Sequence, residues 1–176
     1  MLKDFNIDKF KKNKPPSDNS FDTMQEIKQL QKINMDKSFV KKFDDGKKVF
    51  TNVVGKDPLI SKLIDQSTPH IMSLKKYFNR PRPAVLARKL KLKLHDIKLK
   101  SMDTPAYPSG HATQATLLQL ALSDKYPNKK KELKALAENI IKSRHLAHTH
   151  YKSDSDIGRK LGQAMYQHIK INYNGV

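Results

Sequence analysis

Apolar side chains recur every three or four positions along most of the chain, which is the spacing of amphipathic helices. Ser20 is suited to cap the first of them, and Pro81 and Pro83 halt another. The pattern predicts helices over residues 21–33, 39–43 with an end near Asp45-Gly46, 57–64, 68–78, 112–122, 129–143 and 157–169. With no repeat and no interdomain linker, this succession predicts one all-α domain of roughly seven or eight helices.

Two segments depart from this pattern. Residues 89–94 alternate lysine and leucine, so a short strand, a helix and an extended basic loop all remain open for residues 84–104. Residues 1–20 are rich in lysine and end in a Pro-Pro-Ser-Asp-Asn-Ser turn. We therefore divide the chain into a basic N-terminal arm, residues 1–20, and a domain, residues 21–176.

The composition narrows the class of protein. The chain has 176 residues, of which 37% are hydrophobic and 30% charged, enough for one packed core. This excludes a multidomain enzyme, a fibrous protein and an integral membrane protein. There is no cysteine, so disulfides and thiolate chemistry are excluded. Neither a membrane span nor an N-terminal apolar signal is present, so we expect a cytoplasmic protein unless a leader has been removed.

The net charge of +18 attracts nucleic acid, anionic lipid or phosphorylated substrates. Most of the 35 basic residues are lysines, and the arginines are few: Arg80, Arg82, Arg88, Arg144 and Arg159. Proteins that read or stack on bases usually use more arginine and more aromatic residues. We therefore do not expect a nucleic-acid partner. The lysine-rich surface favours peripheral contact with an anionic membrane or the steering of anionic substrates.

Three short motifs carry residues suited to phosphate chemistry: Lys75-x6-Arg82-Pro83, Pro108-Ser109-Gly110-His111 and Ser143-Arg144-x5-His150-x3-Asp154. Each alone has a structural explanation, as a solvated charge, a turn or a surface pair. Together they supply three cations, a hydroxyl and a backbone N–H at a helix start, which can surround a phosphoryl group. His150 has a carboxylate, Asp154, one helical turn away and can act as a nucleophile. His111 can then protonate the leaving oxygen.

These motifs resemble the three-part signature of the type 2 phosphatidic acid phosphatase (PAP2) superfamily. The chain is most similar to the bacterial class A non-specific acid phosphatases within that group, which also contains the vanadium-dependent haloperoxidases. The resemblance implies an all-α helical bundle of the PAP2 and vanadium haloperoxidase type. It also implies a phosphatase that hydrolyses phosphomonoesters through a phosphohistidine.

The resemblance assigns a role to each matching residue. His150 is implied as nucleophile, Asp154 as its orienting group and His111 as general acid. The phosphoryl oxygens would be held by Lys75, Arg82, Ser109, Gly110 and Arg144. Neither metal nor cofactor is implied, although phosphate or vanadate can occupy the site. The expected partner is a small phosphorylated substrate. The oligomeric state stays open, with a homodimer as one alternative because short members of the family often pair.

Three alternatives remain. His145, His148, His150 and Asp154 also resemble a metal cluster, which would need further ligands elsewhere. A vanadate-dependent haloperoxidase uses the same constellation, although such enzymes are generally much longer. A basic module that binds nucleic acid or anionic membrane accounts for the charge but leaves the motifs unexplained.

Overall fold

The computed structural model describes residues 1–173, and within this range it contains helices and no strand. The predicted all-α class is therefore confirmed. The α-helices are α1 Phe21–Gln31, α2 Lys37–Phe43, α3 Gly46–Val54, α4 Pro58–Phe78, α5 Pro83–Lys89, α6 Gly110–Lys125, α7 Lys130–Leu146 and α8 Lys152–Asn172. Three short 3-10 helices join them: η1 Ile7–Phe10, η2 Lys100–Asp103 and η3 Pro127–Lys129.

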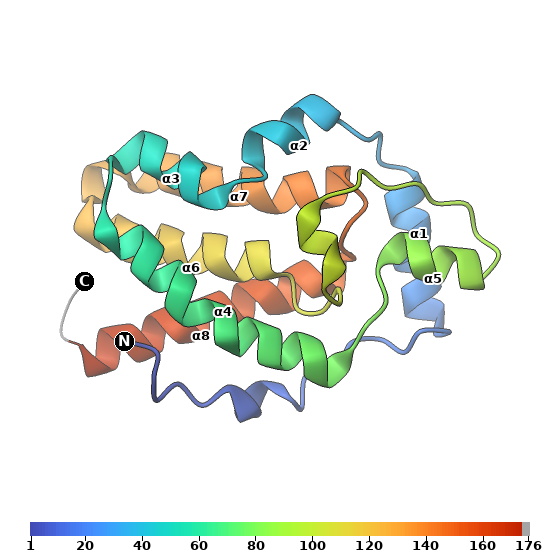
Figure 1. Ribbon diagram of the computed structural model, residues 1–176, viewed down its shortest axis with the longest axis horizontal. Helices are drawn as coiled ribbons and strands as arrows, with labels where there is room; N and C mark the ends of the chain where they lie inside the picture. Colours follow the sequence, from blue (N-terminus) through green and yellow to red (C-terminus); the bar gives the residue numbers. More distant parts are fainter. Residues whose placement is uncertain (174–176) are drawn as a thin grey trace.

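Helix α6 lies at the centre of the bundle, with α8, α7 and α4 packed around it (Figure 1). Its buried residues lie on all sides of the helix, as expected for an element enclosed by neighbours. Helices α1 and α5 pack together at one end of the molecule (Figure 1). A smaller apolar cluster fills that end: Ile27, Leu86, Ala87, Ala106 and Tyr151.

Polar residues fix where several helices begin. Each accepts a hydrogen bond at its side-chain oxygen from a backbone N–H in the first turn that follows: Ser20, Asp36, Asp45, Asp57 and Ser109. Such a cap typically contributes about 1 kcal/mol. The predicted cap at Ser20 and the predicted start at Asp57-Pro58 are confirmed.

The two helices predicted over residues 57–64 and 68–78 are in fact one, α4, with Pro69 inside it. Proline cannot donate the N–H that this position supplies to the preceding turn. The hydroxyls of Ser67 and Thr68 donate to the carbonyl of Ile64 in that turn, at 3.0 and 2.7 Å. The buried face of α4 continues on both sides of the proline. Packing of this face against the core therefore outweighs the tendency of Pro69 to interrupt the helix.

The sequence pattern also missed α3. The prediction ended a helix near Asp45-Gly46, whereas Asp45 caps a new helix by accepting a bond from the N–H of Lys48 at 3.0 Å. Val49 and Phe50, which face the core, were the available signal. Aspartate followed by glycine is typical of turns and helix ends alike, so the local chemistry did not separate the two cases.

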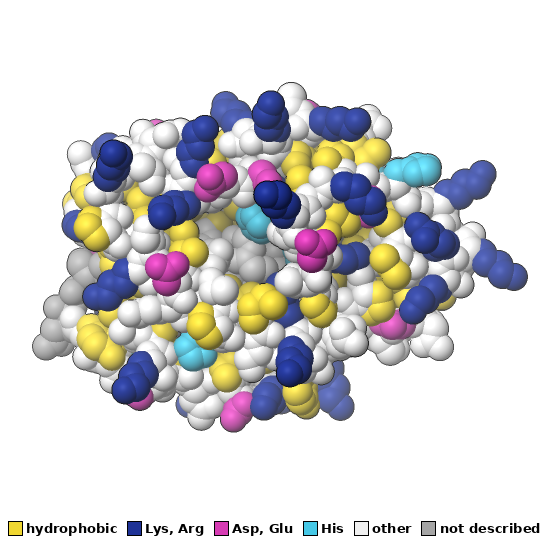
Figure 2. All heavy atoms as spheres, viewed as in Figure 1, with side chains coloured by type: hydrophobic (Ala, Val, Ile, Leu, Met, Phe, Trp, Pro, Cys, Tyr) yellow, Lys and Arg dark blue, Asp and Glu magenta, His cyan; other side chains and the backbone are white. Residues whose placement is uncertain are grey.

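The structure decides between the alternatives for residues 84–104. Residues 83–89 are helical, and the lysine–leucine alternation continues as a loop that pairs with no strand. Leu90, Leu92 and Leu94 pack against the smaller apolar cluster, while Lys91 and Lys93 are exposed. Figure 2 shows basic side chains spread over one face of the molecule, with several projecting at the end where α5 and this loop lie.

The lysine-rich residues 1–20 are attached to the bundle. Leu2 is 1% exposed, and its backbone N–H donates to the Gln66 side chain at 3.1 Å. The hydroxyl of Tyr107 donates to the carbonyl of Asn13 at 2.6 Å. The division at residue 20 stays a prediction, but apolar and polar contacts both hold this segment against the helices.

Two glycines let α8 approach α6 closely. A Cβ atom at Gly162 would lie 2.5 Å from the carbonyl oxygen of Thr113. A Cβ atom at Gly158 would lie 2.8 Å from the carbonyl oxygen of Ser109. Both oxygens belong to backbone, which cannot move aside as a flexible side chain can. The close packing of these two helices therefore depends on the absence of side chains here.

We expect Gly162→Ala to lower the free energy of unfolding by about 1–3 kcal/mol, because the added methyl group forces the two backbones apart. Urea denaturation followed by circular dichroism measures this. Gln163→Ala, at the exposed neighbouring position of α8, should change stability by no more than about 0.5 kcal/mol. Equal stability of Gly162→Ala and wild type would contradict the packing described here.

Candidate active site

The three sequence motifs meet in space. They are carried by helix ends that converge on one region: Lys75 at the end of α4, Arg82 before α5, Ser109, Gly110 and His111 at the start of α6, Arg144 at the end of α7, and His150 and Asp154 at the start of α8. The first turns of α6 and α8 add unpaired N–H groups and the positive ends of two helix dipoles. Such an arrangement favours an anion.

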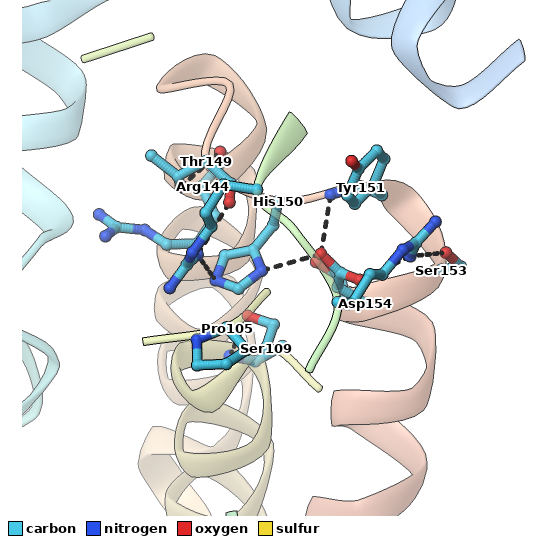
Figure 3. Close-up of polar contacts among 12 residues, drawn as sticks. Pro105, Ser109, Arg144, Thr149, His150, Tyr151, Ser153 and Asp154 are labelled. Carbon is cyan, nitrogen blue, oxygen red and sulfur yellow. Dashed lines mark hydrogen bonds and ion pairs between the residues drawn. The ribbon is translucent and has the colours of Figure 1, made fainter. Parts of the chain in front are cut away.

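His150 lies between a carboxylate and a guanidinium (Figure 3). Its Nδ1 is 3.1 Å from Oδ2 of Asp154, and its Nε2 is 2.9 Å from Nη1 of Arg82. A carboxylate can only accept a hydrogen bond, and a guanidinium can only donate one. Nδ1 therefore carries the proton, and the lone pair is on Nε2.

Burial dominates the ionisation of this pair. It lowers the pKa of His150 well below its usual value, and the charges of Arg82 and Lys75 act in the same direction. Burial also raises the pKa of Asp154 to about 6, while the nearby guanidinium of Arg80 acts to lower it. At neutral pH the pair therefore consists of a carboxylate and a neutral imidazole, which is the form whose Nε2 carries no proton.

Asp154 has no exposed surface, and both of its carboxylate oxygens are engaged. Oδ2 accepts from Nδ1 of His150 and from the backbone N–H of Tyr151 at 3.0 Å (Figure 3). Oδ1 accepts from Nη1 of Arg80 at 2.7 Å. The backbone carbonyl of Asp154 accepts from the N–H of Ser109 at 3.0 Å, which ties the start of α8 to the start of α6.

Backbone carbonyl groups surround Arg82. Its Nε and Nη2 donate to the carbonyls of Thr104 and Ser101 at 2.9 and 2.6 Å. Nη1 donates to the carbonyl of Thr149 at 2.8 Å as well as facing His150. Burial lowers the pKa of Arg82 to about 10, which leaves it charged at neutral pH. These contacts fix the guanidinium plane beside the imidazole.

Lys75 is 4% exposed and donates to the carbonyl of Pro105. Burial lowers the pKa of its ammonium group to about 7, and the charge of Arg82 acts in the same direction. Lys75 therefore titrates near neutral pH. An anion bound beside it would raise that pKa again, because opposite charge favours the protonated form.

A cavity of about 240 Å³ opens at this point. Five of the predicted residues line it: Lys75, Arg82, Gly110, His111 and His150. The other three have no exposed surface: Ser109, Arg144 and Asp154. The Ser109 hydroxyl accepts from the N–H of Ala112 at 3.3 Å and so caps α6. The structure thus brings all eight predicted residues into one region, with three of them fully buried there.

His111 borders a second cavity as well, of about 220 Å³, whose lining includes Phe50 and Leu118. Its Nε2 lies 2.9 Å from the backbone carbonyl of Asp44, which can only accept, so this nitrogen carries a proton. Burial lowers the pKa of His111 to about 4, and the charge of Arg144 acts in the same direction. The imidazole is therefore neutral at neutral pH.

Arg144 is held by the segment between α2 and α3. Its Nη1 donates to Oδ1 of Asp44 at 2.7 Å, and its Nε donates to the Ser143 hydroxyl at 3.0 Å. Its Nη2 is buried and has no hydrogen-bond partner among the residues that the structure describes. This nitrogen is a donor still available for a further acceptor.

Sequence reasoning missed three charged residues at the site: Glu26, Asp44 and Arg80. Arg80 is 2% exposed and contacts both Asp154 and Glu26. The scarcity of arginine in the chain was a signal that could have singled it out. No comparable signal marked Asp44 or Glu26, because their partners lie far away along the chain.

The histidines of the alternative metal cluster have separate partners. Nε2 of His145 is 3.0 Å from the Ser155 hydroxyl. Both ring nitrogens of His148 lie within 2.9 Å of backbone carbonyls, those of His95 and Ile33. Within residues 1–173, no group of three or more histidine, aspartate or glutamate side chains has an arrangement that could hold a metal ion.

Comparison with known proteins identifies the family. The family model described as the PAP2 superfamily matches residues 58–173. The chain belongs to the PAP2 superfamily. The matched range contains all eight predicted site residues. It begins after α3, so Glu26 and Asp44 lie outside it.

Two curated relatives are named "Non-specific acid phosphatase". The one from Salmonella typhi is 35% identical over 98 residues, and the one from Salmonella typhimurium is 34% identical over 98 residues. Each alignment covers 56% of this chain and 39% of the relative. The predicted likeness of this PAP2 protein to the acid phosphatases is confirmed, over well under half the length of these relatives.

No helix within residues 1–173 has both the length and the apolar character that are needed to cross a lipid bilayer.

The ionisation of Lys75 predicts how anion binding depends on pH. We expect sulfate to bind more weakly as the pH rises above about 7, because Lys75 loses its proton there. Sulfate keeps its charge over this range, so any change of Kd with pH comes from ionisation of the protein. Isothermal titration calorimetry measures this Kd, which should rise by at most about tenfold per pH unit.

Lys75→Met should bind sulfate weakly and with little dependence on pH. Lys76→Met, at the exposed neighbouring position, should retain the wild-type dependence. A wild-type Kd that stays constant between about pH 6 and pH 9 would show that Lys75 does not titrate at an anion site.

Proposed function

We propose that this PAP2 protein is a metal-independent phosphatase that hydrolyses small phosphomonoesters through a phosphohistidine at His150. The observation that carries the proposal is the orientation of His150. Asp154 fixes the proton on Nδ1, which leaves the Nε2 lone pair beside Arg82 in a cationic cavity. Family membership and the names of the two Salmonella relatives support the same reaction class.

In the first step, Nε2 of His150 attacks phosphorus and the bond to the leaving oxygen breaks. Asp154 stabilises the positive charge that develops on the imidazole. His111 donates a proton to the leaving oxygen. Protein groups alone lower its pKa to about 4, and an anionic substrate would raise that pKa toward the range in which His111 can carry the proton.

In the second step, His111 takes a proton from water, and the resulting oxygen attacks phosphorus. The bond from phosphorus to Nε2 breaks, inorganic phosphate leaves, and His150 regains its lone pair. The two steps leave His150 and His111 as they began, so no further reactant is needed.

The substrate would exchange with acceptors that the protein itself supplies. In the structure, Lys75 and Arg82 donate to backbone carbonyls, and Arg144 donates to Asp44. Phosphoryl oxygens carry more charge than carbonyls and make stronger hydrogen bonds with cations. Ser109, Gly110 and the start of α6 would add donors that favour the same anion.

The second cavity supports the assignment of His111. This side chain stands between the cationic cavity and a second one that is partly lined by Phe50, Leu118 and Ile140. A leaving group in the second cavity would present its oxygen to His111.

Pairing into a homodimer, contact with an anionic membrane and a cytoplasmic location stay predictions.

We expect His150→Ala to lower kcat for p-nitrophenyl phosphate by about 10³-fold or more, because the nucleophile is lost. Colorimetric release of p-nitrophenol measures this. His95→Ala, which removes an exposed imidazole, should keep wild-type kcat. A His150→Ala protein as active as wild type would contradict the assignment of the nucleophile.

Two additions to the same assay test the reaction class. Hydrolysis should persist in EDTA and should be inhibited by vanadate, which imitates the five-coordinate phosphorus of the transition state. Loss of activity in EDTA, restored by a divalent metal, would indicate a metal-dependent enzyme instead.

A further inference from the structure

Arg80 lies outside the predicted site residues, yet it is among the largest fully buried side chains of the protein. It follows Asn79, which ends α4 in the left-handed conformation with φ of 47°. Its backbone carbonyl accepts from the N–H of Ala106 at 2.9 Å. Its guanidinium carbon stands 3.8 Å from the centre of the Tyr151 ring. These contacts leave Arg80 little freedom to move.

The guanidinium joins two carboxylates. Nη1 donates to Oδ1 of Asp154 and to the Ser153 hydroxyl, both at 2.7 Å. Nη2 donates to Oε2 of Glu26 at 3.0 Å. Glu26 also accepts from the backbone N–H and the hydroxyl of Ser153, at 2.6 and 2.8 Å. Glu26 on α1 is thereby tied to the first turn of α8.

The charges in this cluster act in opposite directions on the Asp154–His150 pair. Arg80 adjoins Asp154 and disfavours a proton on the pair. Glu26 adjoins Arg80, is 12% exposed at its side chain, and offsets part of that positive charge. The other charged or titratable groups around the Asp154–His150 pair come from every neighbouring element: Lys75 from α4, Arg82 before α5, Tyr107 before α6, His111 from α6, Arg144 from α7 and Tyr151 before α8.

We propose that Arg80 and Glu26 are positioning residues that set the protonation of the Asp154–His150 pair: Arg80 keeps the pair unprotonated, and Glu26 limits that effect. The proposal rests on the proposed phosphatase reaction for its kinetic consequence. The geometry on which it stands is independent of that reaction. Arg80 holds the Asp154 oxygen that points away from His150, so it acts on the imidazole only through the carboxylate.

The two residues should shift the pH profile in opposite directions. Arg80→Gln removes a positive charge, so the pair gains its proton more readily and the acid limb of kcat moves to higher pH by about one unit or more. Glu26→Gln removes a negative charge, so the acid limb moves to lower pH, by about half a unit. Ionisation of the substrate is common to all variants and does not contribute to these differences.

A second readout requires no activity. NMR titration of the His150 ring nitrogens in the free protein should show the same displacements, upward in Arg80→Gln and downward in Glu26→Gln. Arg80→Lys keeps the charge without the planar fork. It should lower kcat while leaving the acid limb within about 0.3 pH units of the wild-type position. If Arg80→Gln does not fold, Arg80→Lys is the variant at this position that is compared with wild type, because it keeps the positive charge.

The chain offers a matched control pair of the same chemistry. Arg159 on α8 pairs through both terminal nitrogens with Glu138 on α7, at 2.5 and 2.6 Å, and neither residue lines the cavity at the site. Arg159→Gln and Glu138→Gln should leave kcat and the acid limb unchanged.

The proposal would be overturned if Arg80→Gln and Glu26→Gln displaced the acid limb in the same direction. It would also be overturned if neither variant displaced it. Reduced stability without displacement would reduce both residues to a structural role. Opposite NMR displacements in a protein without phosphatase activity would support the positioning role and overturn the proposed function. Phosphatase activity in a protein whose His150 titration does not move in either variant would support the proposed function and overturn the positioning role.

Discussion

Asp154 has no contact with solvent, so the charge of its carboxylate has to be compensated within the protein. Its partners come from two segments of the chain: Arg80 beyond the end of α4, and His150 and the N–H of Tyr151 just ahead of α8. Its backbone carbonyl also joins α8 to the start of α6 through Ser109. One buried residue thus links the orientation of a histidine to the relative position of the helices that line the cavity.

That arrangement requires α6 and α8 to be close together. The glycines of α8 permit the approach, and the starts of both helices then lie beside each other with their unpaired N–H groups and positive dipole ends. Lys75, Arg82 and Arg144 add positive charge around the same point. Backbone carbonyls and Asp44 accept the hydrogen bonds of these cations. Burial and mutual repulsion between the cations therefore explain the lowered pKa values of Lys75, Arg82 and His111.

Local sequence signals predicted those parts of the fold that local interactions decide. Ser20 and Asp57 mark helix starts because capping involves neighbours along the chain. Pro69 and Asp45 misled the prediction because packing against distant helices decides whether the chain continues as helix. The site motifs were recognisable by residue type and order, so all eight predicted residues could be named. Glu26 and Asp44 were not, because they find their partners through the fold: Asp44 is 100 positions from Arg144. For Arg80 the scarcity of arginine was the available signal, but it did not indicate which partners this residue contacts.

The central claim is that His150 itself receives the phosphoryl group. Rapid acid-free quenching during turnover of a phosphomonoester, followed by peptide mass spectrometry, tests it most directly. We expect phosphate on His150, stable in base and lost in acid, and none in a His150→Ala protein or in enzyme quenched without substrate. Turnover at the wild-type rate with no phosphate on His150, or with phosphate on another residue, would contradict it.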